Sequence, residues 1–359
     1  MSSSLLTPAD FLEADVLSPR VSDALSSTPP SQFHSENYLA YQEDHPDSRI
    51  DPRILNLSYS SLQTLHSCPR KFQLYKLRSS YKTGNTEKET ITFAFGHCVG
   101  EAIQFSLAGL SKNEIIWKLF QTWDAPLFAE DEKANKSFWS SLLALDRFVN
   151  MRDQGFLDGY ELAHFNGKPA IELSFCVVFP DGFRLRGYVD AVLIHRDTGA
   201  VLVLEAKTTG SASFSPSQFK NSAQGIGYSI VLDVIAPGIN SYEVLYLVYQ
   251  TKTGEFTPIP FTKTYLQRAL WIKELLLDIE TIKMYEEHAV YPMRGESCYS
   301  FFRDCQYINT CQLSTKYLTN PYDEEKDGDK EEYQINLTLM DLIDAQLSKT
   351  SDFGELSET

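Results

Sequence analysis

Two carboxylates and a lysine are the residues of this sequence best suited to chemistry. Asp190 ends the segment Gly187-Tyr188-Val189-Asp190, and Glu205-Ala206-Lys207 follows fourteen residues later. If Asp190 and Glu205 each lie late in one of two antiparallel strands joined by a short turn, the two residues can lie side by side. Glu205 and Lys207, two residues apart on one strand, then face the same way. The spacing therefore predicts two carboxylates and one ammonium at one sheet surface.

This set of groups suits phosphodiester hydrolysis. Carboxylate oxygens hold a hard cation such as Mg²⁺, which takes few protein ligands and keeps several waters. The cation lowers the pKa of a bound water and neutralises charge on the phosphate. A neighbouring lysine can orient the attacking water or stabilise developing charge.

A structural ion pair is the alternative explanation for these charges. Alternating acids and bases on a solvent-exposed strand would give a similar pattern. The preceding run Val201-Leu202-Val203-Leu204, however, is apolar on both faces, as in a buried central strand. Charged residues at the end of such a strand favour a functional site over an ion pair.

Three further features extend the candidate site. His97 and Glu101 are four residues apart in a predicted helix over 95–107 and share one helical face, although a buried core histidine would have the same spacing. Gln224 and Tyr228 are also one helical turn apart, in a position to bind a phosphate or to position Lys207; ordinary helix packing is the alternative. Glu172, at the start of the strand that precedes the Asp190 strand, is a weaker candidate.

These motifs, in this order, resemble the RecB-type branch of the PD-(D/E)XK nucleases, which includes the iron–sulfur nucleases of CRISPR adaptation. The similarity covers roughly residues 55–315 and includes an opening helix with Leu57-Ser58-Tyr59-Ser60-Ser61-Leu62 and Cys68-Pro69-Arg70-Lys71-Phe72. The resemblance implies a restriction-endonuclease-like α/β fold, a central mixed sheet flanked by helices. It implies a DNA exonuclease of recombination, repair or replication, encoded by a phage or its host.

The resemblance also assigns roles to single residues. His97, Asp190, Glu205 and the carbonyl of Ala206 would bind Mg²⁺ or Mn²⁺. Lys207 would be catalytic together with the two carboxylates, and Gln224 and Tyr228 would support the substrate or the lysine. Two alternatives remain open: a structure-specific endonuclease with the same site, and a single-strand DNA-binding protein that does not cut.

Four of the six cysteines form a second candidate metal site. Cys68 precedes the predicted catalytic core, and Cys298, Cys305 and Cys311 follow it. The same family resemblance implies a [4Fe–4S] cluster held by these four thiolates. The first gap among the three late cysteines is longer than is usual in such proteins, so structural zinc and unligated thiols stay as alternatives. Cys98 and Cys176 lie within a predicted helix and strand, as core residues.

Basic side chains alternate with rings after Pro69. Arg70, Lys71, Lys76 and Arg78 are interleaved with Phe72 and Tyr75. Such a mixture suits single-stranded DNA or free DNA ends, through phosphate contacts and base stacking. A solvated helix face is the alternative.

The elements that must position these residues form one α/β unit. Helices are expected over 58–77 with an interruption near Pro69, and over 95–107, 112–123, 135–152, 216–234 and 261–287; strands are expected over 171–179, 183–195, 200–206 and 242–250. This alternation predicts a central sheet flanked by helices, within a nuclease domain spanning 51–320.

Composition places the acidity of the chain outside that domain. The net charge of the 359 residues is −16, but residues 51–320 carry 28 acids and 27 bases. A nearly neutral domain can still present a basic groove to DNA. Residues 1–50 are expected to be a disordered tail. Residues 321–359 are expected to be an acidic tail whose stretch from Ile335 to Leu347 docks on a protein partner or folds back on the nuclease.

The chain is expected in the reducing cytoplasm. It has no apolar run long enough to cross a bilayer, its N-terminus does not have the pattern of a secretion signal, and its cysteines do not suggest a disulfide scaffold.

Overall fold

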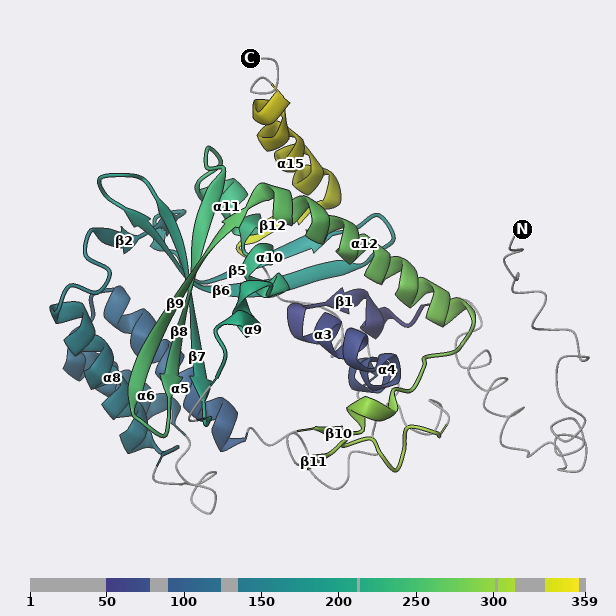
Figure 1. Cartoon of the computed structure of the whole chain (residues 1–359), viewed down its shortest axis with the longest axis horizontal. Helices are drawn as coiled ribbons and strands as arrows, with labels where there is room; N and C mark the ends of the chain where they lie inside the picture. The colour runs from purple at the N-terminus through teal and green to yellow at the C-terminus, as the bar shows by residue number, and fades with distance from the viewer. Residues whose placement is uncertain are drawn as a thin grey trace, which may run out of the picture.

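A mixed sheet of eight strands forms the centre of the molecule in the computed structural model (Figure 1). The structure describes residues 50–77, 90–123, 135–211, 214–300, 303–313 and 333–354. The predicted N-terminal tail, apart from Ile50, lies outside these residues. The main strand order is β12-β5-β6-β7-β8-β9, and the short strands β1 (Asn56–Leu57) and β2 (Tyr160–Leu162) pair with β6.

The three predicted consecutive strands are confirmed. They are β5 (Ile171–Val178), β6 (Arg184–His195) and β7 (Val201–Thr209), and each is antiparallel to the next. β7 then pairs in parallel with β8 (Ser241–Gln250), which makes the sheet mixed. A parallel pair needs a crossover connection, and the segment between β7 and β8 supplies it.

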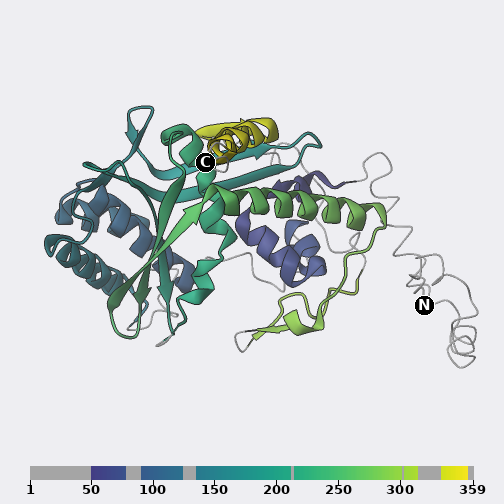
Figure 2. The same cartoon turned by 45° about the horizontal axis from the view of Figure 1, so that its top comes forward.

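Helices cover both faces of the sheet (Figures 1 and 2). On one face, α5 (Ile91–Leu107) and α8 (Phe138–Asp153) pack on the sheet, and α6 (Lys112–Thr122) packs against them. The other face carries α3 (Tyr59–Ser67), α4 (Pro69–Lys76) and the long α12 (Tyr265–Glu287). Ser58 caps α3 and Pro69 begins α4, so the predicted interruption of this helix is confirmed.

The crossover between β7 and β8 differs from the single helix predicted over 216–234. It contains three short helices, α9 (Ser217–Lys220), α10 (Ala223–Gly227) and α11 (Ser229–Ile235). Glycines explain part of this break, because each lowers helix stability by about 1 kcal/mol relative to alanine. Gly225 also allows close packing on the sheet: a Cβ there would lie 2.9 Å from the hydroxyl of Tyr246.

The long helix predicted from Phe261 was placed too early. Residues Glu255–Thr264 form β9, antiparallel to β8, and the helix begins only after Thr264, which caps it. Pro258 and Pro260 obscured this strand in the sequence. A proline cannot donate to a strand ladder, so it is confined to positions such as an edge strand, and β9 is the last strand of the sheet.

The C-terminal stretch is the region where the structure differs most from the prediction. Ile335–Thr338 form β12, which pairs in parallel with β5, and Leu339–Gly354 form α15. Leu342 is fully buried, and its carbonyl accepts a hydrogen bond of 3.2 Å from the buried guanidinium of Arg268. The stretch that was predicted to dock on a protein partner or to fold back on the nuclease therefore packs on the nuclease, as part of its core. The acidic run over 323–332 lies outside the described residues.

Among the described residues, no helix combines the length and apolar character required to span a membrane.

Candidate active site

The sheet opens where Asp190 and Glu205 lie. β6 pairs with β5 through the residues up to Ala191, and it pairs with β7 only from Ala191 to Ile194. Beyond Leu204, β7 keeps β8 as its partner, along Glu205 to Thr209. β6 and β7 thus diverge after the Ala191–Leu204 pair, and the backbone of β7 facing this opening is available for other contacts.

Asp190 and Ala206 meet at the opening. A carboxylate oxygen of Asp190 accepts a hydrogen bond of 2.8 Å from the backbone N–H of Ala206. In an extended strand the N–H and C=O of one residue point toward the same neighbouring strand. The Ala206 carbonyl therefore faces the same opening as the Asp190 carboxylate.

Glu205 is the centre of a hydrogen-bond network. Its side chain is almost fully buried. One carboxylate oxygen accepts from the ammonium of Lys207 and, at 2.9 Å, from the side-chain amide of Gln224, whose own oxygen accepts from Lys207 at 3.3 Å. The other oxygen accepts from the hydroxyl of the buried Tyr228. The structure thus brings together the predicted residues from β6, β7 and the helices of the crossover.

The charges of the site act strongly on one another. Burial, and then the nearby Glu205, raise the pKa of Asp190 well above its usual range. Burial alone would lower the pKa of Lys207, but Glu205 and Asp190 outweigh it, so the pKa of Lys207 is raised and the ammonium stays charged. Burial, together with Glu205, also raises the pKa of the Tyr228 hydroxyl, which keeps that hydroxyl a hydrogen-bond donor to Glu205.

The donors at this opening fit a hard divalent cation. Asp190 and Glu205 offer carboxylate oxygens and Ala206 a carbonyl, the ligand types that Mg²⁺ and Mn²⁺ prefer. Burial, and then repulsion from Glu205, raise the pKa of Asp190, and a cation between the two carboxylates would relieve that repulsion. In the described part of the chain, no three His, Cys, Asp or Glu side chains are already arranged to hold a metal ion.

His97 lies at the margin of this group. It is exposed on α5, and the adjacent Gly96 packs on β7, where a Cβ would lie 3.5 Å from the hydroxyl of Thr208. Thr208 follows Lys207, so α5 reaches β7 beside the network. Because Thr208 and Lys207 alternate along the strand, α5 and Lys207 lie on opposite faces of it.

Glu172 links α5 to Asp190. It has a φ of 47°, in the left-handed region that is uncommon for a residue other than glycine. Its carboxylate accepts a 2.6 Å hydrogen bond from the buried Gln104 on α5, and its charge contributes to the raised pKa values of Asp190 and Glu101. Gln104 was missed in the sequence, although it lies seven residues after His97 and three after Glu101, a spacing that keeps all three on one helix face.

Tyr59 is a second residue that the sequence analysis did not assign to the site. It is the first residue of α3, and its hydroxyl lies 3.5 Å from the hydroxyl of Ser222, just before α10. Its phenol also contributes to the raised pKa of Lys207. No sequence spacing links Tyr59 to Lys207, because the two lie almost 150 residues apart; only the packing of α3 brings them close.

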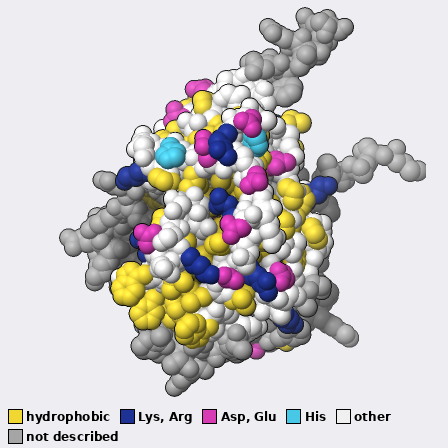
Figure 3. Space-filling view, turned by 90° about the vertical axis from the view of Figure 1, so that its left-hand side faces the viewer, with side chains coloured by type: hydrophobic (Ala, Val, Ile, Leu, Met, Phe, Trp, Pro, Cys, Tyr) yellow, Lys and Arg dark blue, Asp and Glu magenta, His cyan; other side chains and the backbone are white. Residues whose placement is uncertain are grey.

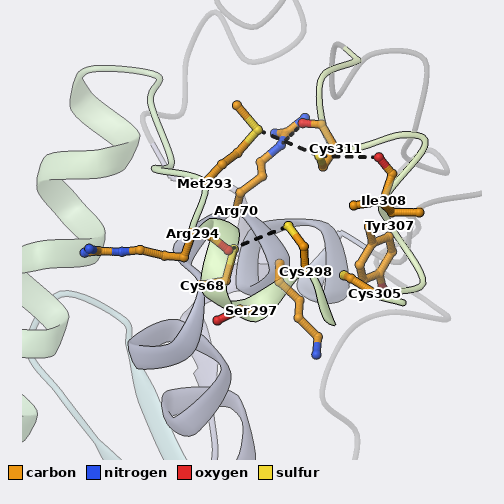
Figure 4. A pocket seen from close by; sticks show the side chains of 11 residues that line it. Cys68, Arg70, Met293, Arg294, Ser297, Cys298, Cys305, Tyr307, Ile308 and Cys311 are labelled. Atoms are coloured by element: carbon orange, nitrogen blue, oxygen red, sulfur yellow. Dashed lines mark hydrogen bonds between the residues drawn. The ribbon is translucent and has the colours of Figure 1, made fainter. Parts of the chain in front are cut away.

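The four cysteines of the predicted cluster surround one pocket (Figure 4). Cys68 comes from the start of α4, and Cys298, Cys305 and Cys311 come from the segment after α12, which contains β10 (Tyr299–Ser300) and β11 (Arg303–Asp304). Burial, reinforced by the other three thiols, raises the pKa of Cys311 despite the opposing charge of Arg70. Cys98 and Cys176 are buried in α5 and β5, as predicted for core residues.

The predicted DNA-binding residues divide into three groups. Arg70 donates to the carbonyls of Cys311 and Leu313 at 2.8 and 2.6 Å, so its guanidinium holds the late cysteine segment against α4. Lys76 donates to the carbonyl of Asn56. Lys71 lines the cysteine pocket, and Arg78 lies outside the described residues. The structure therefore gives Arg70 and Lys76 contacts within the protein that the helix-face pattern did not predict.

Comparison with known proteins identifies a family. A family model described as the PD-(D/E)XK nuclease superfamily matches residues 56–312. The chain is also similar to the crystal structure of a candidate exonuclease from Eubacterium rectale, with 12% identity, a TM-score of 0.45 and coverage of 83% of this chain and 98% of that chain. A crystal structure of a protein designated SSO0001 is similar with 13% identity, a TM-score of 0.27 and coverage of 69% of this chain and 85% of that one. No curated protein matches the chain.

Proposed function

Because the chain belongs to the PD-(D/E)XK nuclease superfamily, we propose that it is a metal-dependent exonuclease that hydrolyses phosphodiester bonds in DNA. The family implies a nuclease that acts on nucleic acid. The choice of DNA, of free ends and of Mg²⁺ or Mn²⁺ is part of the proposal, as is a role in recombination, repair or replication.

The network around Glu205 is the observation that carries the proposal. Lys207, Gln224 and Tyr228 all donate to one buried carboxylate, and Asp190 lies across the strand opening from it. A structural ion pair would need only Glu205 and Lys207. Three donors on one glutamate, with a second carboxylate beside it, instead hold the oxygens in fixed positions, as a preorganised site requires.

Each residue of the candidate site has a separate role in the proposed reaction. Asp190, Glu205 and the Ala206 carbonyl would hold the cation, with His97 as a further ligand; the cation supplies a water of lowered pKa and neutralises phosphate charge. Lys207, which stays protonated, places a positive charge where negative charge develops on the phosphate oxygens. Gln224 orients both Lys207 and Glu205, since its side-chain oxygen accepts from Lys207 and its side-chain N–H donates to Glu205. Tyr228 holds the second oxygen of Glu205.

We also propose a second metal centre at the cysteine pocket. Four thiols from opposite ends of the domain line one pocket, which is the donor set of a [4Fe–4S] cluster or of structural zinc. Such a centre would fasten the segment over 295–313 to α4, in addition to the hydrogen bonds of Arg70. We favour iron–sulfur because of the family resemblance. Iron and sulfide analysis of anaerobically purified protein distinguishes it from zinc.

Digestion of end-labelled linear and circular DNA tests the function. Purified full-length protein with Mg²⁺ or Mn²⁺ is expected to shorten linear strands from their ends, with single strands preferred, and to leave circles intact. Cutting of circles would establish an endonuclease instead. Binding of single strands without any cutting, in the presence of Mn²⁺, would contradict the proposal and favour a non-cleaving DNA-binding protein.

A further inference from the structure

The surface formed by α6 and α8 carries a continuous group of aromatic rings that the candidate active site does not use. Trp117 and Phe120 lie on α6, and Phe138 and Trp139 lie at the start of α8. Trp117 and Phe120 are stacked with centroids 6.1 Å apart, Phe120 meets Phe138 edge-on at 5.9 Å, and Phe138 meets Trp139 at 6.0 Å. We call these four residues the aromatic surface.

Three of the four rings are largely exposed. Trp139 is 75% exposed, Trp117 61% and Phe120 60%. Figure 3 faces the side of the molecule on which α6 and α8 lie and shows hydrophobic side chains gathered at one lower corner of that face. Large rings are rarely left in water in such a group, so a contiguous exposed patch of this kind marks a binding surface.

The aromatic surface is joined to the candidate active site through α5. The hydroxyl of Thr122, at the end of α6, donates to the carboxylate of Glu101 at 3.3 Å, one helical turn after His97. Lys136, two residues before Phe138, donates to the hydroxyl of Thr92 at 2.9 Å, near the start of α5. Both α6 and α8 are thus bonded to α5, the helix that carries His97 and whose Gly96 lies against Thr208 of β7.

The exposed ring of Phe93 lies on the connecting helix itself. It is 65% exposed and lies four residues before His97, so the two share one face of α5. An exposed ring therefore stands on the same face of α5 as the histidine of the candidate site.

We propose that the aromatic surface is a stacking platform for the bases of single-stranded nucleic acid whose end is held at the Asp190–Glu205 opening. This inference rests on the proposed function and names the part of the substrate that the chain recognises away from the cut. Stacking on aromatic side chains suits any base, because every base has a π-face, and so it serves an enzyme that acts without regard to sequence.

The chemistry of the surface favours bases over a protein partner. The most exposed large apolar side chains of α6 and α8 are rings, and Leu143, at 46%, is the exposed aliphatic one. α6 also contains two lysines and one glutamate, and that Glu114 already accepts hydrogen bonds from Ser111 at the helix start. The ammonium of Lys118 lies 5.4 Å from the centroid of the Phe105 ring on α5, and it leaves α6 with one more basic than acidic side chain to face the phosphates of a bound strand.

Binding of DNA by full-length protein tests the platform. The protein carries Lys207→Ala so that the DNA stays whole, and anisotropy of a labelled 20-nucleotide oligothymidylate and of a duplex of the same length gives the two dissociation constants. Replacement of Trp117, Phe120 or Trp139 by Ala is expected to weaken single-strand binding about tenfold per ring, because each replacement removes one ring on which a base stacks. Duplex binding is expected to change less than about twofold, because paired bases do not expose their faces.

The matched control removes equally exposed apolar side chains from another helix. Leu266, Leu270 and Leu277 on α12 are 71%, 58% and 66% exposed, and their replacement by Ala is expected to leave both constants unchanged. Trp139→Phe is expected to keep single-strand binding and Trp139→Leu to lose it, since only the first retains a ring. The proposal would be overturned if the variant with Trp117, Phe120 and Trp139 all replaced by Ala bound single strands as tightly as the Lys207→Ala protein does. Equal losses of affinity for duplex and single strand would overturn it as well.

The outcomes separate this inference from the proposed function. Ring-dependent binding by a chain that cuts no DNA in the digestion assay would remove the nuclease proposal and keep the platform. Cutting of linear strands together with ring-independent binding would keep the nuclease and remove the platform.

Discussion

The Glu205 network and the cysteine pocket are both candidate metal centres, but they are held together in different ways. Around Glu205, hydrogen bonds from Lys207, Gln224 and Tyr228 set the positions of the donors. Around the pocket, the four cysteines lie on the start of α4 and on a segment with little regular structure. The apolar side chains that pack next to the pocket form only a small cluster, centred on Leu74 and Tyr307.

The difference predicts two kinds of dependence on metal. A site built on central strands and fixed by side-chain hydrogen bonds keeps its shape without the ion, and the ion contributes chemistry. A site whose ligands come from loops depends on the ion for its structure, because binding free energy there is folding free energy. Substitutions in the active site should therefore mainly lower the cutting rate, and substitutions in the cysteine pocket should mainly lower stability.

The largest expected effect follows from removing a charged group of the active site. Asp190→Asn and Lys207→Ala are each expected to lower the cutting rate by about 10³-fold or more, because cation binding and charge stabilisation are lost. The melting temperature is expected to change by only a few degrees. Lys283→Ala, which removes a partly exposed lysine that bonds Asp181 and Glu280, is the matched control and should cut normally. Full activity of either site variant would contradict the assigned roles.

Tyr228→Phe should have a smaller effect on catalysis and a measurable effect on stability. It removes one donor from the buried Glu205, and a hydrogen bond to a charged group contributes about 1.5–3 kcal/mol. We expect a fall in rate of about 10- to 100-fold and a measurable loss in the free energy of unfolding. Tyr242→Phe serves as control, because its hydroxyl donates to the Gly225 carbonyl at 2.9 Å without touching Glu205. Equal rate losses in the two variants would mean that Tyr228 only supports packing.

Loss of the pocket metal should act on stability first. Cys305→Ser is expected to remove the bound iron or zinc and to increase cleavage by protease within 295–313 several-fold, since this segment has little core of its own. Metal analysis and limited proteolysis followed by mass spectrometry measure both effects. Cys176→Ser, in the core strand β5, should retain the metal. An unchanged metal content in Cys305→Ser would refute the four-thiol assignment.

The smallest expected effect is a difference in reactivity between a core cysteine, Cys98, and the cysteines of the pocket. Burial, opposed in part by the hydrogen bond with Ser141, raises the pKa of Cys98 to about 11 from an ordinary value of 9.0. Its neutral thiol thus contributes stability that is fully present below pH 9 and is lost as the pH rises toward 11. At pH 8, iodoacetamide should leave Cys98 unmodified and label Cys298 and Cys305 in metal-free protein. Peptide mass spectrometry measures this, and labelling of Cys98 at the same rate as the pocket thiols would show the prediction to be wrong.

Much of the candidate site could be predicted because its residues follow local spacing rules. Glu205 and Lys207 share a strand face, Gln224 and Tyr228 share a helical turn, and the structure brings both pairs together. The mixed sheet flanked by helices, expected from the family resemblance, is also confirmed. In these cases a short sequence pattern determines which side of an element a side chain occupies.

Other features depended on partners far away in the chain. The prolines of β9 were compatible with a strand only because β9 is at the sheet edge. The apolar stretch from Ile335 had a clear hydrophobic pattern, but the pattern could not say that its partners were β5 and α12 rather than another protein. Arg70 and Lys76 had the spacing of a basic helix face, yet backbone carbonyls outside α4 accept their hydrogen bonds.

The sequence by itself determined the chemical types present and their local geometry: a carboxylate pair, a lysine two residues from one of them, and four cysteines divided between the two ends of the domain. Tertiary structure alone decided that β6 and β7 part beside Asp190, that Tyr59 approaches Lys207, and that the rings of α6 and α8 form one surface beside α5. The physical reason is that strand and helix periods fix directions over a few residues. The choice of distant neighbours follows from how the whole apolar surface of the chain is buried, which no local pattern contains.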